Sequence, residues 1–444
     1  MTDTKRRGSG AGAKHATGAG PSASKPLGDV SPNIRHAVGT WLKSPAFDFY
    51  AIVIIGGLLV GIGLVMVLSS SSVGQIARGL SPFGGFLSQA IFAMVGLVAA
   101  AITVCLPISL LKKMWCAHLI LILGLALQSL VFVRGIGMNV NGNLNWIRIG
   151  PLQGQPSEFL KIALALWLGA YLAHNRDRLR NVSTLLIAAV AILLSLGLVV
   201  GGRDLGTMMM LAALATGALW AAGVPKRWFA VVTLVGGAGV LAFVLQSPNR
   251  MARVGNWLHG ECPGDSCWQS DNGLMALAEG GITGVGLGGS RQKWGRIPHA
   301  ENDFIFAIIG EELGLFGTLT VVVLFALLAI VLYRVMMRNR DPFVQITTAA
   351  ISTWLIVQAF VNMSVVVGLL PVLGVPLPFV SAGGSALVAS MIALGLLANF
   401  ARNEPGAREA ISARAWFARR SATVVAGSDA ALTPRRAPRR KRTS

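Results

Sequence analysis

The sequence has 444 residues, of which 54% are hydrophobic and only 13% are charged, and its mean hydropathy is +0.64. A soluble domain needs far more charge to cover its surface, so this composition excludes a soluble globular protein and indicates lipid as the solvent. The formal net charge of +20 would suggest nucleic acid as a partner if the basic residues lay on one domain. They gather instead at the two ends and in short loops, which is a signal of membrane topology.

The apolar stretches predict the fold class. About ten of them reach the roughly 17–25 residues that a helix needs to cross a bilayer. We therefore expect an all-α integral membrane protein with about ten transmembrane helices over residues 47–402. The predicted spans begin near Phe47, Phe83, Met114, Ser157, Thr184, Leu205, Trp228, Asp303, Val344 and Phe379.

The two ends of the chain differ from this apolar region. Residues 1–46 are rich in Gly, Ser, Ala and Lys and lack the apolar core of a signal peptide, which predicts a disordered, basic cytoplasmic segment. Residues 403–444 predict a disordered basic cytoplasmic tail, which ends in Arg439-Arg440-Lys441-Arg442. This tail is either a solvated arm or a site for anionic membrane lipid.

Lysine and arginine set the orientation. For ten spans, the loops on one side carry most of them, and the positive-inside rule places that side and both termini in the cytoplasm. The basic groups on that side are 112–113, 176–180, 226–227, 334–340 and the two ends. The loop from about 247 to 302, between the seventh and eighth spans, is then extracytoplasmic and by far the longest.

Two cysteines lie in this long loop. Cys262 and Cys267 flank the sequence Pro-Gly-Asp-Ser, in which Pro-Gly favours a turn. The compartment outside the cytoplasm permits oxidation, so we predict a disulfide between them, with two free thiols as the alternative. Cys105 and Cys116 lie at cytoplasmic ends of spans and are expected to act as small apolar residues.

Ionisable residues inside a span are costly and need a partner or a task. Glu158 and Lys161, at the start of the fourth span, are three residues apart and share one helix face. They are either a structural ion pair or a charged wall of a substrate cavity, and the spacing leaves both open. Asp204, before the sixth span, is expected to cap that helix.

A glycine-rich stretch follows within the long loop. Residues 284–289 fit the pattern G-x-G-x-x-G, but no strand precedes them and the loop lies outside the cytoplasm, which excludes a dinucleotide site. The backbone N–H groups around Gly284, Gly286 and Gly288 could hold a phosphate, with Lys293 adding charge. A tight re-entrant turn packed on other helices is the alternative, and the spacing does not choose between them.

Four acidic residues lie at the end of the loop and in the first turns of the eighth span, namely Glu301, Asp303, Glu311 and Glu312. Asp303 stands where the loop enters the eighth span, as a helix cap or as a general base at the membrane surface. Glu311 and Glu312 lie about two turns further in. We expect at least one of them to pair inside the protein with a basic residue such as Arg203.

Five stretches, in this order and topology, resemble signatures of the SEDS family (shape, elongation, division and sporulation) of membrane proteins. They are residues 146–161, 204–207 (DLGT), 269–293, 298–314 and 368–385 (GLLPVLGVPLPFVSAGGS). The resemblance covers about residues 47–402, and the stretches at 304–314 and 376–381 look more like the cell-division branch than the elongation branch. The sequence departs from the common pattern at residues 143–145, at Arg203 and at residues 301–302, so roles of these neighbours carry over less directly.

The resemblance implies a peptidoglycan glycosyltransferase that polymerises lipid II during septal cell-wall synthesis. It implies as partners a class B penicillin-binding protein, other divisome membrane proteins and membrane lipid, in the bacterial cytoplasmic membrane at the division septum. A lipid II flippase, a scaffold for the penicillin-binding partner and an elongation-branch polymerase are the alternatives.

The resemblance also assigns roles at the site. Asp303 is implied as the catalytic residue. A divalent cation, Mg²⁺ or Mn²⁺, is a candidate cofactor. The substrate-binding or supporting candidates are Glu158, Lys161, Arg148, Asp204, Lys293, Gly284, Gly286 and Gly288.

Overall fold

The computed structural model describes residues 44–412, apart from residues 78, 141, 151, 246–247, 260–266 and 298–299. Most of the predicted disordered segments 1–46 and 403–444 therefore lies outside the described residues. The predictions for these two ends stay predictions.

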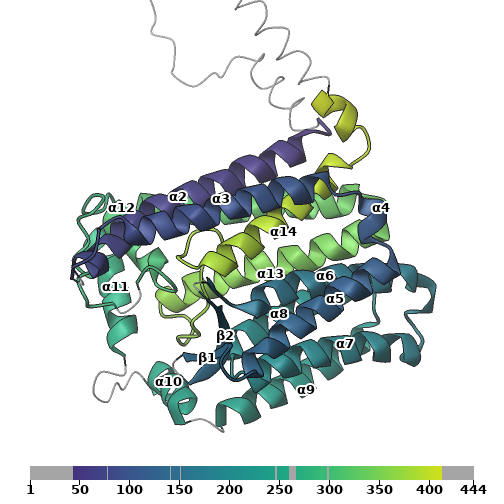
Figure 1. Ribbon diagram of the computed structural model, residues 1–444, viewed down its shortest axis with the longest axis horizontal. Coiled ribbons are helices and arrows are strands. Elements are labelled where there is room, and N and C mark those ends of the chain that lie inside the picture. The colour runs from purple at the N-terminus through teal and green to yellow at the C-terminus, as the bar shows by residue number, and fades with distance from the viewer. Residues whose placement is uncertain are drawn as a thin grey trace, which may run out of the picture. The chain divides into compact units, whose positions relative to one another are not determined.

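Ten long helices occupy the positions of the ten predicted spans in this described part of the chain (Figure 1). The predicted fold class is confirmed, and most helices begin within two residues of the expected start. The last one begins five residues later than Phe379, because residues 379–383 belong to the preceding loop. The helices are α2 (Phe47–Ala77), α3 (Gly84–Cys105), α5 (Met114–Ser129), α6 (Pro156–His174), α7 (Val182–Gly201), α8 (Leu205–Ala222), α9 (Lys226–Leu245), α12 (Ile305–Arg338), α13 (Pro342–Val366) and α14 (Gly384–Arg402).

Among the described residues, eight of these helices are long and apolar enough to cross a membrane by length and composition. The two others are α6 and α9. Helix α6 is buried along almost its whole length, so it packs against protein rather than lipid and tolerates a less apolar sequence. Helices α3 and α7 show the opposite pattern, with large apolar side chains exposed along them, as lipid-facing helices require.

Helix α13 packs closely against two neighbours. A Cβ atom at Gly169 of α6 would overlap the Thr347 side chain of α13, and one at Gly217 of α8 would overlap Thr353 of α13. Glycine at these positions lets the helix backbones approach, which is how helices associate where no hydrophobic effect drives them together. Helices α6, α8 and α13 therefore form a tight centre that fixes the loops at their ends.

A small antiparallel sheet is the main addition to the predicted all-helical fold. It consists of β1 (Gly137–Val140), β2 (Asn143–Ile149) and β3 (Leu152–Gly154), with β2 in the middle and Met138 opposite Trp146. The sequence Asn141-Gly142 is a typical hairpin dipeptide, and Gly142 has a φ of +84°. The N–H of Leu144 donates to the carbonyl of Gly202 (2.8 Å), which ties the sheet to the turn between α7 and α8.

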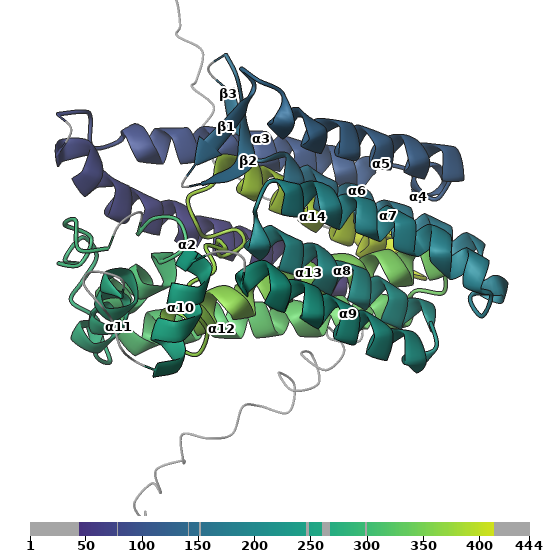
Figure 2. The same ribbon diagram turned by 90° about the horizontal axis from the view of Figure 1, so that it is seen from below.

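The long loop contains two short helices, α10 (Pro248–His259) and α11 (Trp268–Gly280). Both views place them at the same end of the bundle as the sheet, whereas α4 (Ile108–Leu111) lies at the opposite end (Figures 1 and 2). The sheet, the long loop and the start of α12 thus share one end of the bundle, as the predicted topology requires.

A cluster of charges joins three segments at the opposite end. Asp48 of α2 pairs with Arg334 (2.9 Å) and Arg338 (3.1 Å) of α12, and Arg338 also pairs with Glu404 (3.4 Å), just after α14. Glu404 is buried. This burial raises the pKa of Glu404 to about 8, with a smaller upward contribution from Asp48 and opposing ones from the two arginines.

This shift predicts a pH-dependent stability. Between the ordinary pKa of 4.5 and the folded-state pKa of about 8, the folded protein keeps the Glu404 proton that the unfolded chain has lost. The unfolded chain then binds fewer protons, so the contribution to stability is complete below 4.5 and is lost as the pH rises towards 8. We expect Glu404→Gln to melt at the wild-type temperature near pH 5 and at a higher one above pH 8. Melting curves in detergent across this range test it, with exposed Glu409→Gln as the control. A difference that does not change with pH would contradict the assignment.

Candidate functional site

Asp303 lies at the end of the long loop, two residues before α12 begins, and is half-buried. It does not occupy the cap position, which is held by Phe304 without a side-chain hydrogen bond. Its backbone carbonyl accepts a hydrogen bond from Asn362 Nδ2 (2.8 Å), and its carboxylate lies beside the backbone of Gly374. Of the two sequence interpretations, helix capping is therefore wrong for Asp303, and the general base stays a prediction.

Two amides on α13 hold the loops around Asp303. Gln358 and Asn362 are four residues apart and lie on one face of the helix. Asn362 Nδ2 also donates to the carbonyl of Val375 (2.8 Å), and Gln358 Nε2 donates to that of Pro376 (2.9 Å). Neither amide is among the site residues predicted from the sequence, although a pair of polar residues at helical spacing in an apolar span is a signal for them.

Glu158 and Lys161 form an ion pair of 2.8 Å whose side chains are 3% and 1% exposed. The Lys161 ammonium also donates to Gln358 Oε1 (3.2 Å) and lies 4.4 Å from the centre of the Trp354 ring. With almost no exposed surface, the pair cannot line an open cavity. The structure therefore supports the structural ion pair, which braces α6 against α13 and reaches Asp303 only through Gln358 and Asn362.

Asp204 caps α8, as predicted, and does more. Its Oδ1 accepts the N–H of Thr207 (2.9 Å). Its Oδ2 accepts hydrogen bonds from the Thr207 hydroxyl (2.8 Å), from Asn145 of β2 (2.9 Å) and from Gln155, the residue before α6 (2.9 Å). The carboxylate thus joins α8, the sheet and the start of α6. Gln155, its partner there, lies three residues before Glu158.

Arg148 lies on β2 and is exposed. Its backbone N–H donates to the carbonyl of Ile136 (2.8 Å). This arrangement anchors the strand and leaves the guanidinium at the surface of the bundle end that carries the long loop. Arg148 keeps its predicted position but is separate from the buried Glu158–Lys161 pair.

The glycine-rich stretch forms the re-entrant turn that sequence analysis left as an alternative. Helix α12 is broken at Gly314, which has a φ of +65°. The carbonyls of Glu311 and Glu312 accept the N–H groups of Val285 (2.9 Å) and Gly286 (3.0 Å). The N–H groups of Gly284, Val285 and Gly286 are all donated to protein carbonyls, so the predicted phosphate cradle is wrong for this part of the turn.

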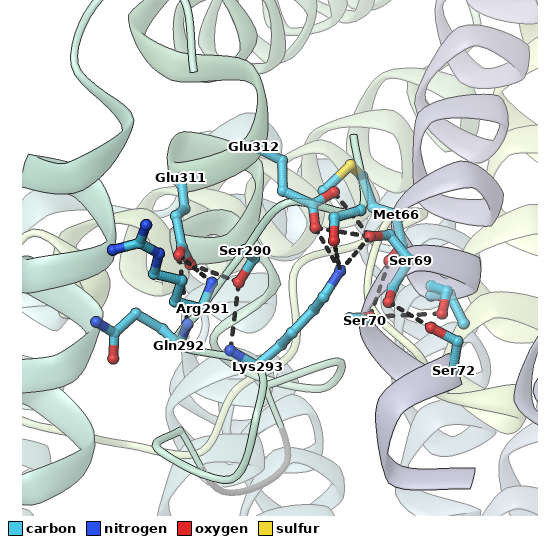
Figure 3. Close-up of polar contacts among 12 residues, drawn as sticks. Met66, Ser69, Ser70, Ser72, Ser290, Arg291, Gln292, Lys293, Glu311 and Glu312 are labelled. Atoms are coloured by element: carbon cyan, nitrogen blue, oxygen red, sulfur yellow. Dashed lines mark hydrogen bonds and ion pairs between the residues drawn. The ribbon is translucent and has the colours of Figure 1, made fainter. Parts of the chain in front are cut away.

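Lys293 also points inward (Figure 3). Its ammonium pairs with Glu312 Oε1 (2.9 Å) and donates to the Ser69 hydroxyl of α2 (3.0 Å) and to the carbonyl of Gly288 (2.9 Å). All three ammonium protons have acceptors, so the predicted contact of Lys293 with a phosphate is wrong. The predicted pairing of a buried glutamate is confirmed, with Lys293 rather than Arg203 as the base.

Glu311 holds the same loop through hydrogen bonds. It accepts hydrogen bonds from the Ser290 hydroxyl (2.5 Å) and from the N–H groups of Arg291 (2.5 Å) and Gln292 (3.3 Å). The predicted residues thus separate into two groups. Asp303, Glu158, Lys161 and Asp204 each contact an amide side chain, from Asn362, Gln358 or Gln155. Lys293 and the glycines form a second cluster around Glu311 and Glu312, which lie eight and nine residues beyond Asp303.

The predicted disulfide and the candidate divalent cation can be compared only with the described residues. Cys267 is disulfide-bonded, and Cys105 and Cys116 are free, but Cys262 lies outside the described residues, so the Cys262–Cys267 pairing stays a prediction. Within the described part of the chain, no group of three or more His, Cys, Asp or Glu side chains converges on a point where a metal ion would sit.

The sequence is similar to proteins of one known family. Residues 50–405 match the cell cycle protein family of FtsW, RodA and SpoVE. The chain belongs to this family. It is 37% identical over 398 residues to a probable peptidoglycan glycosyltransferase FtsW of Mycobacterium tuberculosis, covering 89% of this chain and 75% of the relative. It is 33% identical over 353 residues to the stage V sporulation protein E of Bacillus subtilis, covering 79% of this chain and 96% of that protein.

Solved structures of this family share the fold. One from a study of polymerisation and crosslinking by a peptidoglycan synthase complex matches with a TM-score of 0.65 and 25% identity, covering 80% of this chain and 97% of the other. The rod shape determining protein RodA of Thermus thermophilus matches with a TM-score of 0.60 and 24% identity, with the same coverage. The family's multi-pass membrane architecture is therefore the architecture of this chain.

The brace between α6 and α13 generates a stability prediction. Lys161→Met leaves the Glu158 carboxylate buried without its partner, so we expect the free energy of unfolding to fall by about 3–5 kcal/mol. Glu158→Gln combined with Lys161→Met removes both charges and recovers most of this loss. Unfolding of the detergent-solubilised protein measures it, with Lys112→Met as a control that breaks the exposed pair with Asp341 and costs at most about 1 kcal/mol. A double variant as unstable as the single one would argue against the brace.

Proposed function

We propose that this protein is an inverting peptidoglycan glycosyltransferase that polymerises lipid II, with Asp303 as its catalytic base. Membership of the FtsW, RodA and SpoVE family and relatives named peptidoglycan glycosyltransferase support the activity. The observation that carries the assignment of Asp303 is its half-buried position at the start of α12, held through its backbone by Asn362.

The reaction joins two membrane-anchored sugars. The 4-hydroxyl of the acceptor sugar attacks the anomeric carbon of the donor, and the bond from that carbon to the lipid pyrophosphate breaks. Asp303 takes the hydroxyl proton as the new bond forms, and the pyrophosphate leaves with the bonding electron pair. The donor bond is α and the product bond is β, so one in-line displacement with inversion suffices and no covalent enzyme intermediate is needed.

The leaving pyrophosphate requires positive charge or hydrogen-bond donors. Lys161 and Lys293 are both occupied by buried carboxylates, which leaves the exposed guanidinium of Arg148 as the predicted cationic candidate. A divalent cation, Mg²⁺ or Mn²⁺, would be held mainly by the substrate's own phosphates and by water, since Mg²⁺ keeps several waters and no group of three or more protein ligands gathers among the described residues. Such a cation would neutralise charge on the leaving group.

The proposed setting follows from the relatives and from the charge pattern. The relatives named FtsW favour the division branch over the elongation branch, and with it the septal membrane. The similar structure from the study of a peptidoglycan synthase complex supports a class B penicillin-binding protein as partner. Other divisome proteins follow from the division branch. Both termini are assigned to the cytoplasm by the positive-inside rule.

The base assignment predicts the behaviour of Asp303→Asn. The amide cannot accept the acceptor's proton, so we expect glycan synthesis from lipid II to fall by about 10²–10⁴-fold while the protein folds and melts as wild type does. Polymerisation of lipid II by purified protein in detergent, with and without the penicillin-binding partner, measures it. Asp271→Asn is the matched control, because Asp271 is an exposed aspartate in the same loop. Wild-type rates in Asp303→Asn would remove Asp303 from the mechanism.

A further inference from the structure

The long loop and the first turns of α12 are packed together as one unit. A Cβ atom at Gly273 of α11 would contact the Phe304 ring, and one at Gly280 would overlap the carbonyl of Gly310. The side chains of residues 304–310 are buried. Helix α11, the turn that follows it and the start of α12 therefore cannot shift independently, and Asp303 lies at one end of this unit.

The break in α12 is what receives the turn. A continuous helix would bond the carbonyls of residues 311 and 312 to the N–H groups of residues 315 and 316. Those two N–H groups donate instead to the carbonyls of Gly281 (3.0 Å) and Ile282 (3.4 Å), while residues 285 and 286 supply the missing donors. Because backbone groups buried in a membrane protein need partners, the turn and the broken helix complete each other.

The side chains at the break close on the same turn (Figure 3). Glu312 is completely buried, and its carboxylate pairs with Lys293 and accepts the hydroxyl of Ser69 through Oε1 (2.6 Å) and Oε2 (2.8 Å). Ser69 belongs to α2, which lies outside the packed unit. The three side chains therefore connect the unit to a separate helix of the bundle.

We propose that Lys293 is a positioning residue for the proposed glycosyl transfer, which it serves through its ion pair with Glu312 and its hydrogen bond to Ser69. The three side chains fix the turn against the broken helix and fix the unit against α2. They thereby set the position of Asp303, which lies two residues before α12 begins and nine residues before Glu312. Lys293 does this without touching the substrate, and the inference rests on the proposed function for its activity readout.

Ser69→Ala is the mildest test, because it removes one hydroxyl and leaves the ion pair in place. We expect the rate constant kcat for glycan synthesis to fall by about five- to tenfold, since about 1.4 kcal/mol of lost positioning is a factor of ten. The KM for lipid II and the melting temperature should stay close to those of the wild type. Ser72→Ala is the matched control: its hydroxyl donates only to the Ser69 carbonyl within α2 (2.9 Å), and it should change nothing. An unchanged kcat in Ser69→Ala overturns the proposal.

Variants that remove the buried charges distinguish three possible roles of Lys293: positioning, substrate binding and stabilisation of the fold alone. Lys293→Met leaves the buried Glu312 carboxylate alone and should lower both the melting temperature and kcat, the latter by about 100-fold. Adding Glu312→Gln removes the stranded charge, so the double variant should regain the melting temperature but only part of kcat, with an unchanged KM. A raised KM in the double variant would make Lys293 a substrate ligand. A full return of kcat with the melting temperature would make the pair merely structural. Either result overturns the proposal.

A readout without catalysis keeps this inference apart from the proposed function. In an Asp303→Cys background, a membrane-impermeant maleimide reports how accessible position 303 is in right-side-out vesicles, where the free Cys105 at the cytoplasmic side is protected. Adding Ser69→Ala or Lys293→Met should change the labelling rate several-fold, and adding Ser72→Ala should not. Shifted labelling, together with no glycan synthesis by the wild-type protein with its natural Asp303, would sink the proposed function alone. Unchanged labelling, together with glycan synthesis by that wild-type protein, would sink the positioning role alone.

Discussion

A charge within a membrane protein must find its partner in the protein, because lipid supplies neither water nor counterions. Two buried lysines show how this chain meets that constraint. Lys161 pairs with Glu158 and Lys293 pairs with Glu312, each at less than 3 Å. Each pair also binds a polar side chain of another helix, Gln358 in the first case and Ser69 in the second. The free-energy cost of burying the charges is therefore offset only when these helices are correctly placed against each other.

The broken helix α12 obeys the same constraint with its backbone. A break at Gly314 exposes carbonyl and N–H groups at membrane depth, which is tolerated only where protein supplies the missing partners. Residues 281–286 supply them. The long loop is therefore part of the helical bundle rather than a separate domain above it. Packing of the loop on the helices therefore fixes the position of a residue at its end, such as Asp303.

This arrangement divides labour among the polar residues. Each buried lysine is paired with a glutamate, and the carboxylate of Asp204 accepts hydrogen bonds from donors on three segments of the protein. Asp303 is half-buried at the end of the long loop, and Arg148 is exposed on β2 at the same end of the bundle. Charged residues of the same type thus have different environments in this protein. A proton acceptor for glycosyl transfer must keep access to the substrate, and a brace must lose it.

The sequence by itself predicted the positions of the ten long helices and the cap at Asp204, because these follow from local composition and helical spacing. It also predicted that Glu158 could pair with Lys161, since residues three apart share a helix face. It could not decide whether Lys293 and the glycines face a phosphate or the protein. That choice depends on Ser69 and Glu312, which lie 224 and 19 residues away in the chain. Only the tertiary structure brings such groups within hydrogen-bonding distance, and so only it decided which charges are braces.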